Sequence, residues 1–475
     1  MAKIKKITIK GQNYDIKAEY DINDNKIVET YATKSELSTE TNNRINNEAS
    51  MKADISSLQV DKQDKLVAGS GLDITGNVIS VLGFHYSKFT FEGDSGVLTA
   101  VEGECATAFD SATNTINMDT LINIYPFNQL KREEIQLQYA DGSNLLNKDR
   151  FTTAPNLYYC QTIGSDGQTQ TIEFANYKAG DNFKRPYDDD SISRVGIGCY
   201  LACEDTTQSS APVLRSNTTT NGGIFKVNIS QAQCENELPY YNGEKIDMLD
   251  SKVWFFFKAL MECFIGYRNC QAKYRGICDY SWNSGNYYTE QEVRATEHVG
   301  GTWLAGATDS ITSDTLTMTG EVSTWTEDDI TTSITSGKRP FAILGIENPY
   351  GLLWQNLGGL YHTDQNLYQY TGTTHKSNST FDTSDCELIA TDLCSSSEGW
   401  QKTLACSNNV CYPISVGGSD SKVVGDYYLY AASNRIFFVG GDWRNGSLAG
   451  FSYLYGSNGF GAAYTSFGFR LSLKM

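Results

Sequence analysis

The segment 437–475 constrains this chain more than any other, because it places a long irregular stretch between two short strands. Residues 437–439 are apolar and β-favouring, and 467–473 reads as a second strand. That second strand alternates its apolar residues on one face, namely Phe469, Leu471 and Leu473. Residues 440–466 between the two strands show no sustained strand or helix period. A long connection of this kind is usually functional or disordered.

Residues 440–466 are too rich in aromatic side chains for a disordered linker. The aromatic residues are Trp443, Phe451, Tyr453, Tyr455, Phe460 and Tyr464. Tyr, Ser, Gly and Arg are also the residue types of antibody paratopes, where rigid amphipathic rings give contact area at low entropic cost. We therefore predict a binding surface. The alternative is a Gly/Ser-rich loop whose small residues satisfy tight turns.

Within 442–466, aromatic anchors are expected to dominate the affinity, as they do at interface hot spots. Asp442 and Arg444 would add charge selectivity. The predicted ligand-binding residues are Asp442, Arg444, Leu448, Phe451, Tyr453, Tyr455, Ser457, Phe460, Ala462 and Tyr464. The residues predicted to support them are Trp443, Asn445, Gly446, Trp354 and Arg470, the last as a paired structural arginine.

Composition narrows the class of protein. A net charge of -18 argues against binding nucleic acid through its phosphates and against docking on an anionic lipid surface. With 42 Gly, 29 Tyr and 21 Phe but only 8 Pro, we expect a β-dominated protein rich in turns. The length of 475 residues allows two or three domains.

No membrane insertion is expected. The first residues, MAKIKKITIK, carry lysines but no apolar core, so we do not expect a secretory signal. The longest apolar run, 253–267, is interrupted by Lys258 and Glu262 and is too short to span a bilayer. The protein is expected to be made in a cytoplasm and to stay soluble there unless another system exports it.

Four segments are expected along the chain. Residues 1–30 predict a β-hairpin, and 31–66 carry a thin heptad stripe that buries too little to be stable alone and should oligomerise. Residues 67–112 predict a short β linker, with β runs around Gly71 and Gly76. Residues 113–475 predict one large domain.

Three features stand out inside 113–475. Residues 252–270 fit a helix with one broad apolar face. Residues 345–360 predict a compact turn and strand around a buried Trp354. The Ser/Thr/Gly-rich stretch 281–335 reads as an insertion of unknown role.

No catalytic or metal-binding motif is recognised, and neither a cofactor nor a metal is expected. The four His lie in unrelated contexts, and no GxSxG or HExxH occurs. The acidic runs 188–190 and 327–329 could hold Ca²⁺ but lack spaced ligands, so solvated turns are favoured. Most of the 12 Cys are expected to be reduced, buried small hydrophobes rather than disulfides.

The terminal segment resembles the variable region of diversity-generating-retroelement target proteins, a group that includes phage tropism determinants. The resemblance lies in GGDWRNGSLAG, the aromatic, Ser/Asn/Gly-rich run after it, and the closing GFRLSL. Residues 442–467 also lack Lys, Glu, Gln, Met, Ile, Val and His. Randomising the first two bases of AAC codons never yields Lys, Glu, Gln, Met or Trp, and Trp443 alone breaks that rule.

The preceding sequence is similar to phage tail fibres and to phage proteins with a C-type-lectin-like fold. A basic strand pair, a polar coiled coil and KQDKL at 62–66 are typical of fibre stems. The order YPF, LRS, FIGYRNCQA and GIENPYGLLW, followed by GGDW and GFRL, is similar to the subclass shared with formylglycine-generating enzymes. The resemblance implies a β-dominated α+β chain, with a β/coiled-coil stem followed by a C-type-lectin-like domain over 113–475. The insertion 281–335 departs from the pattern.

The resemblance implies a function in host recognition. It predicts a receptor-binding protein of the virion tail, a homotrimer through 31–66 that attaches to the tail or baseplate by its N-terminus. The variable loop 442–466 would bind a protein or glycan receptor on the bacterial surface. The order Glu347-Asn348-Pro349 without a WND motif does not support calcium-dependent lectin activity, and the lack of Cys after Cys411 disfavours oxidase chemistry.

Two alternatives stay open. The domain could be an enzyme acting on host surface polysaccharide, which a pair of facing carboxylates in an aromatic groove would reveal. It could instead be a purely structural tail component whose C-terminal loop packs against a neighbouring subunit.

Overall fold

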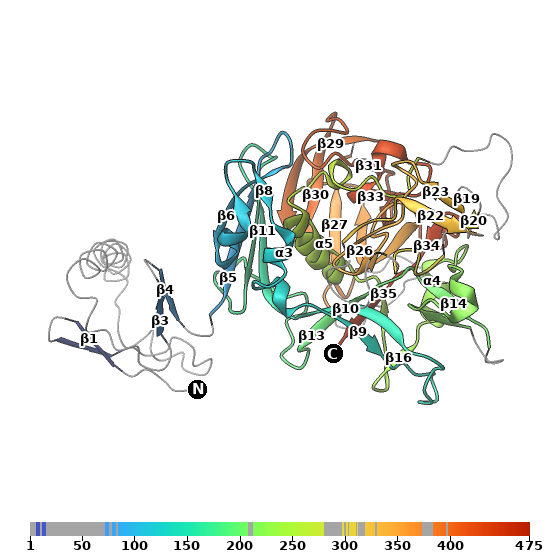
Figure 1. Ribbon diagram of the computed structural model, residues 1–475, viewed down its shortest axis with the longest axis horizontal. Helices are drawn as coiled ribbons and strands as arrows, with labels where there is room; N and C mark the ends of the chain where they lie inside the picture. The colour runs from blue at the N-terminus through green and yellow to red at the C-terminus, as the bar shows by residue number, and fades with distance from the viewer. Residues whose placement is uncertain are drawn as a thin grey trace. The chain divides into compact units, whose positions relative to one another are not determined.

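The computed structural model describes most of residues 84–475 and, before them, four strands. The positions left out after residue 84 are 208–211, 280–296, 299–300, 303, 310, 312–318, 328–329, 373–382 and 396–397. Two compact units, residues 1–83 and 84–475, make up the chain (Figure 1).

The first unit contains two antiparallel hairpins. Strand β1 (Lys6–Ile9) pairs antiparallel with β2 (Gln12–Asp15), within the segment 1–30 for which a hairpin is predicted. Strand β3 (Leu72–Thr75) pairs antiparallel with β4 (Val78–Val81), in the segment where short β runs are predicted. The predicted oligomerising helix over 31–66 lies outside the described residues.

The second unit begins at Phe84, so the predicted boundary at residue 113 is wrong. Residues 84–112, expected to be part of a linker, form β5 (Tyr86–Phe91) and β6 (Leu98–Gly103). Phe89 and Phe91 are completely buried in the main hydrophobic core. The alternation of Phe89 and Phe91 along YSKFTF is a strand signal, and burial of that face draws the segment into the domain.

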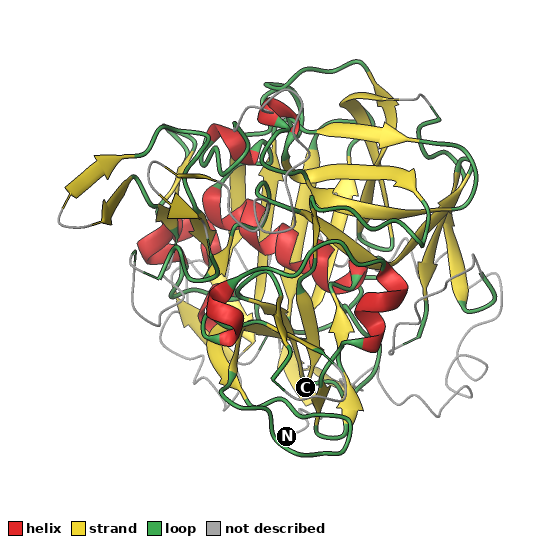
Figure 2. Cartoon of the chain, turned by 90° about the vertical axis from the view of Figure 1, so that its right-hand side faces the viewer, coloured by secondary structure: helices red, strands yellow, loops and turns green. Residues whose placement is uncertain are grey.

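Three sheets form most of the second unit, and strands dominate the ribbon, as expected from the composition (Figure 2). The four-stranded sheet has the order β11-β12-β5-β6, and the five-stranded sheet β18-β35-β13-β10-β9. The bounds of their remaining strands are β9 (Lys131–Ile135), β10 (Asp149–Pro155), β11 (Tyr158–Ile163), β12 (Gln170–Ala175), β13 (Arg194–Gly198), β18 (Asp247–Met248) and β35 (Leu471–Lys474).

The nine-stranded sheet is the largest and curls into a half-barrel. Its main path runs β28-β27-β26-β32-β33-β31-β29-β30, and β34 pairs in parallel with β26. The strand bounds are β26 (Trp354–Thr363), β27 (Asn366–Tyr370), β28 (Cys386–Ala390), β29 (Glu398–Ser407), β30 (Val410–Val416), β31 (Tyr427–Tyr430), β32 (Arg435–Gly440), β33 (Gly450–Asn458) and β34 (Phe467–Gly468).

Helix α5 (Ser251–Ile265) lies among these sheets and fills the main core (Figure 1). It begins at its N-cap Asp250, whose side chain accepts from the Lys252 amide, and ends at Gly266 in the left-handed conformation. The prediction of a helix here is confirmed, but that of a single apolar face is wrong. Every residue of α5 except Lys252 is buried, because sheets pack around it on several sides. The described part of the second unit also contains two shorter helices, α3 (Met118–Leu121) and α4 (Gln231–Asn236).

Even the two charged residues inside α5 are buried. Lys258 and Glu262 form an ion pair of 2.8 Å one helical turn apart. Pairing is what makes two buried charges tolerable in a core. Within the described part of the chain, no helix is both long and apolar enough to cross a bilayer.

The terminal segment differs from its prediction in two ways. Residues 440–466 are not without secondary structure, because β33 lies in the middle of the largest sheet, between β32 and β31. The second strand is also divided, because residues 467–473 form parts of two strands, β34 and β35, rather than one. Strand β32 pairs with β26 and β33, whereas β35 enters the five-stranded sheet beside β13 and β18. The predicted alternation is confirmed, since Phe469, Leu471 and Leu473 pack in one cluster.

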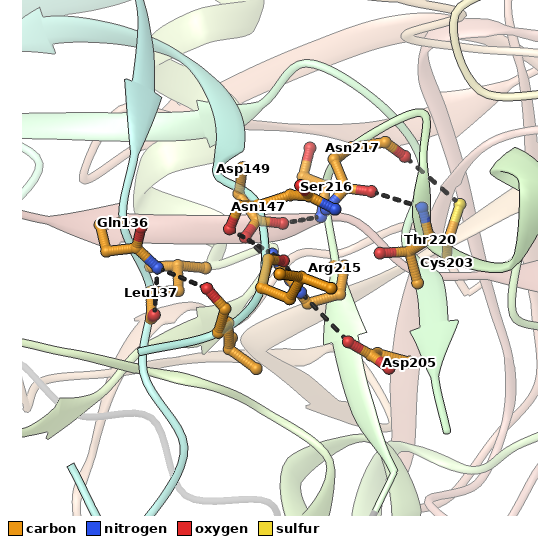
Figure 3. Close-up of polar contacts among 12 residues, drawn as sticks. Gln136, Leu137, Asn147, Asp149, Cys203, Asp205, Arg215, Ser216, Asn217 and Thr220 are labelled. Atoms are coloured by element: carbon orange, nitrogen blue, oxygen red, sulfur yellow. Dashed lines mark hydrogen bonds and ion pairs between the residues drawn. The ribbon is translucent and has the colours of Figure 1, made fainter. Parts of the chain in front are cut away.

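A buried arginine fixes the short sheet of β14 (Cys203–Asp205) and β15 (Val213–Arg215) to the five-stranded sheet (Figure 3). The Arg215 guanidinium pairs with Asp149 at 2.9 Å and with Asp205 at 3.2 Å. It also donates to the main-chain carbonyls of Leu146 and Asn147. The second Asp149 oxygen accepts from the Ser216 amide.

Most cysteines are free and buried, as predicted. The exceptions are Cys386, which is half-buried, and a disulfide between Cys406 and Cys411, which face each other across β29 and β30.

Replacing Arg215 with Met is expected to destabilise the second unit by about 3–5 kcal/mol, because it leaves two carboxylates buried without their cation. Denaturant unfolding measures this loss. The matched control is Lys88→Met, which removes the exposed pair of Lys88 with Glu102 and should cost less than about 1 kcal/mol. Equal losses in the two variants would contradict the role given to Arg215.

Candidate functional site

A recess of about 470 Å³ opens at the C-terminal segment, and we call it the aromatic recess. Its lining comes from the start of β26, from β31, from the turn after β32, from β33 and from the residues before β34. The lining residues are Trp354, Leu429, Asp442, Arg444, Asn445, Tyr453, Tyr455, Tyr464, Thr465, Ser466 and Phe467. The volume lies in the range typical of small-ligand sites.

The aromatic side of the recess is centred on Trp354. Its ring lies 4.5 Å from that of Tyr453, edge to face, and 4.9 Å from that of Tyr455. Trp354 and Tyr453 are nearly covered, Tyr455 is half-buried, and Tyr464 is 53% exposed at the edge. The Tyr464 ring stands edge to face on Phe467 at 4.9 Å. Packed rings of this kind give a rigid surface, with Tyr464 as its most accessible member.

The charged side of the recess is a pair formed by neighbouring residues. Asp442 is 1% exposed, and its carboxylate accepts from the Arg444 amide at 2.9 Å and from the Arg444 guanidinium. The guanidinium also lies over the Trp443 ring, 4.7 Å from its centroid. Asp442 therefore compensates the charge of Arg444 and holds its side chain in place. The accessible polar surface here is that of Arg444, whose side chain is 26% exposed.

The turn that carries this pair is tied down on both sides. The Asn445 carboxamide oxygen accepts from the Asp442 amide, and the Gly446 amide donates to the Cys278 carbonyl at 2.8 Å. Trp443 is buried in a separate apolar cluster and donates its amide to the Leu352 carbonyl. These contacts agree with the supporting roles predicted for Trp443, Asn445 and Gly446.

Five of the predicted ligand-binding residues line the recess together: Asp442, Arg444, Tyr453, Tyr455 and Tyr464. Leu448, Ser457 and Ala462 are half-buried and lie outside its lining. Phe460 is 6% exposed and packs on Tyr361 at 5.5 Å, so its ring is largely withdrawn from solvent.

The prediction that Phe451 contacts a ligand is wrong for this structure. Its side chain is completely buried against Trp254 of α5 and against Tyr350. The pairing of β33 with β32 shifts between Gly450 and Leu454, which is a β-bulge or a similar irregularity of the strand. A bulge changes the face to which a side chain points. Phe451 thus packs in the main core, although it has the same spacing from Tyr453 as Tyr453 has from Tyr455.

Beneath β33 a buried carboxylate fixes the backbone. Asp426 accepts from the Ser452 amide at 2.6 Å, and burial raises the pKa of Asp426 well above its usual range. The Gly450 backbone lies so close to Asp426 that a Cβ atom at this position would be 2.0 Å from an Asp426 carboxylate oxygen. Only glycine fits such an approach, which explains a glycine at the start of this central strand.

Arg470 is buried away from the recess, and its described partners are neutral groups. It is fully buried and donates to the Gln355 side chain and to the carbonyls of Gly198, Glu347 and Asn348. Gln355 follows Trp354 in β26, so Arg470 supports the floor of the recess from behind.

Glu347 ties the stretch 281–335 to the same region. Its buried carboxylate accepts from the Gly306 amide and from the amide and hydroxyl of Thr308. Next to it, Asp309 accepts from Tyr200 and Arg132. Residues 304–309 of the predicted insertion are therefore part of the packed domain.

Sequence reasoning missed one lining residue from a distant element. Leu429 comes from β31, which pairs in parallel with β33. The apolar run YYLY in β31 signals a strand, but nothing in it indicates which strand it joins.

No group of three or more potential metal ligands gathers among the described residues. In the acidic run 188–190, Asp188 and Asp190 pair with Arg185, and Asp189 accepts from Ser191. Residues 328–329 of the other acidic run lie outside the described part.

Comparison with known proteins gives no family assignment. No family model matches the chain, and no curated protein matches its sequence.

The Glu347 carboxyl should make the stability of the fold depend on pH. Burial raises the pKa of Glu347 to about 7, against its ordinary value of 4.5. Because the folded state holds this proton more tightly, the contribution is complete below pH 4.5 and is lost as the pH rises to about 7. Glu347→Gln should reduce the fall in unfolding free energy between pH 5 and 7.5 by roughly 2 kcal/mol.

Urea unfolding at several pH values measures this effect. Glu102→Gln, at the exposed pair with Lys88, is the control that should leave the pH slope unchanged. An unchanged slope in Glu347→Gln would contradict the assignment.

Proposed function

We propose that the chain is a receptor-binding protein of a phage tail fibre, and that the aromatic recess contacts a receptor on the bacterial surface. The observation that carries this proposal is that residues predicted from sequence as ligand contacts lie together around one recess. Five residues chosen from sequence as ligand contacts line one recess with the predicted support residues Trp354 and Asn445. The five come from β33 and the turns on either side of it, whereas Trp354 comes from β26, which is distant in the sequence.

The construction of the recess favours recognition over chemistry. Its aromatic rings are held by one another, and its carboxylate, Asp442, is engaged by Arg444. Glycoside hydrolysis generally uses two carboxylates flanking the bond to be cleaved. A pre-formed aromatic surface instead lowers the entropic cost of binding, because little side-chain freedom remains to be lost.

We further propose that residues 84–475 have a C-type-lectin-like fold and that the protein is a homotrimer joined through 31–66. The motifs GIENPYGLLW and GFRLSL support the first idea, and the heptad stripe supports the second. Three recesses on one fibre would strengthen a weak single-site interaction through avidity. The N-terminal hairpin of β1 and β2 would attach the fibre to the tail or baseplate.

Tyr464→Ala tests the binding role, since this ring is accessible and its removal leaves no cavity in the core. We expect at least about a tenfold loss of adsorption to host cells, as for an interface hot spot, with unfolding free energy nearly unchanged. Tyr453 is less suitable, because its ring is buried and alanine there would also destabilise the domain.

The matched control is Tyr241→Ala, which removes a half-buried ring of β16 (Tyr240–Tyr241) outside the recess. It should adsorb normally. Normal adsorption by Tyr464→Ala would argue against the recess as the contact surface. Loss of assembly in that variant would favour the structural alternative.

Sequencing this gene across a replicating phage population tests diversification. We expect substitutions at the codons of Arg444, Tyr455 and Tyr464, which line the recess, and constancy at Phe451 and Arg470, which are buried. Substitutions distributed equally over buried and recess positions would contradict a selected contact surface. A uniform sequence would indicate a fixed tip.

A further inference from the structure

A second recess, of about 370 Å³, lies at the start of α5 and shares no residue with the aromatic recess. We call it the cationic recess. Its lining includes four basic side chains, Lys178, Lys184, Arg185 and Lys252. Four cations around one small hollow are unexpected in a chain whose net charge is -18.

Lys252 is the innermost of these cations. It lies in the first turn of α5 and is half-buried, and its ammonium donates to the Gly372 carbonyl at 3.1 Å. The same ammonium lies 5.2 Å from the centroid of the Tyr187 ring. Among the described residues, no carboxylate oxygen comes within 4.0 Å of it. Burial accordingly lowers the pKa of Lys252. A partly buried cation without an ion pair is a site where an anion is stabilised.

The acidic groups of the recess have other partners or point into solvent. Glu387 accepts from the Asn408 side chain at 2.7 Å. Asp188 pairs with Arg185 while its own side chain is 93% exposed, and Asp181 is exposed at the rim. None of them closes an ion pair with Lys252. Asp250, Asp247 and Glu387 act on its ammonium through space and favour its charged form, and Asp247 itself pairs with Lys474 at 2.6 Å.

The walls add flat apolar surface beside this charge. Tyr158 and Tyr370 are half-buried lining residues, and the Arg185 guanidinium lies 5.3 Å from the Tyr158 ring centroid. Tyrosine faces suit the C–H face of a sugar ring, and the side-chain amides of Gln369 and Asn408 are suited to its hydroxyl groups. An inorganic ion would use the cations but not these rings.

We propose that the cationic recess binds an anionic saccharide, with its carboxylate or phosphate on Lys252 and its ring against the tyrosines. The site goes beyond the receptor contact proposed above and holds whether or not the aromatic recess binds a receptor. On a bacterial surface, such a site would recognise acidic sugars of the envelope.

Binding of glucuronate and of glucose 6-phosphate to the full chain tests this proposal, with glucose as the uncharged comparison. Titration calorimetry should show that at least one acidic sugar binds and that glucose does not. The two acidic probes distinguish a carboxylate from a phosphate ligand. Lys252→Met should weaken the binding by about tenfold or more, because a hydrogen bond to a charged group is lost. Lys422→Met, at the exposed pair with Asp94, should not.

Chemical labelling of the unmodified chain gives a second readout that does not depend on a variant folding. Acetic anhydride should acylate Lys252 readily, because its lowered pKa leaves more free amine, and glucuronate or glucose 6-phosphate should protect it. Peptide mass spectrometry reports both effects. Equal labelling of Lys252 with acidic sugar and with glucose, or unchanged binding by folded Lys252→Met, would overturn the proposal.

Discussion

Burial of helix α5 among the sheets is the interaction on which the rest of the large unit depends. Phe255, Phe256 and Phe257 are consecutive and all buried, which requires packed elements on several sides of the helix. Each such ring contributes about 1.5–3 kcal/mol when removed from water. The four-stranded sheet supplies Phe89 and Phe174 to this core, and the largest sheet supplies further residues. Both recesses are built on these sheets.

The aromatic recess follows from how β33 is held above that core. Phe451 and Leu454 pack into the main core. The shift in register between Gly450 and Leu454 places Tyr453 on the opposite side of the strand, in the cluster that contains Trp354. Asp426 fixes the Ser452 amide from below. The exposed residues of this segment can then vary without loss of the fold, because the buried ones carry the packing energy. That separation of packing residues from exposed residues would suit the variable contact surface proposed above.

Local patterns predicted much of this arrangement. The helix, the N-terminal hairpin and the buried Trp354 and Arg470 each follow from apolar spacing or from a charge set in an apolar strand. The recess residues followed from composition and resemblance. The burial of Phe451 did not, since a bulge depends on the register between strands far apart in sequence. Nor did the domain boundary at residue 84, because one partner of β5, the strand β12, lies about 80 residues later.

The cationic recess was equally beyond sequence reasoning, since Arg185, Lys252 and Tyr370 come from separate elements that only the fold brings together. The central claim nevertheless concerns the aromatic recess, and photo-crosslinking tests it most directly. A benzophenone amino acid at position 464 would be exposed to host envelopes and its adducts identified by mass spectrometry. We predict adducts with one surface component from position 464 and none from position 241. Equal crosslinking from both positions, or none from position 464, would contradict the account.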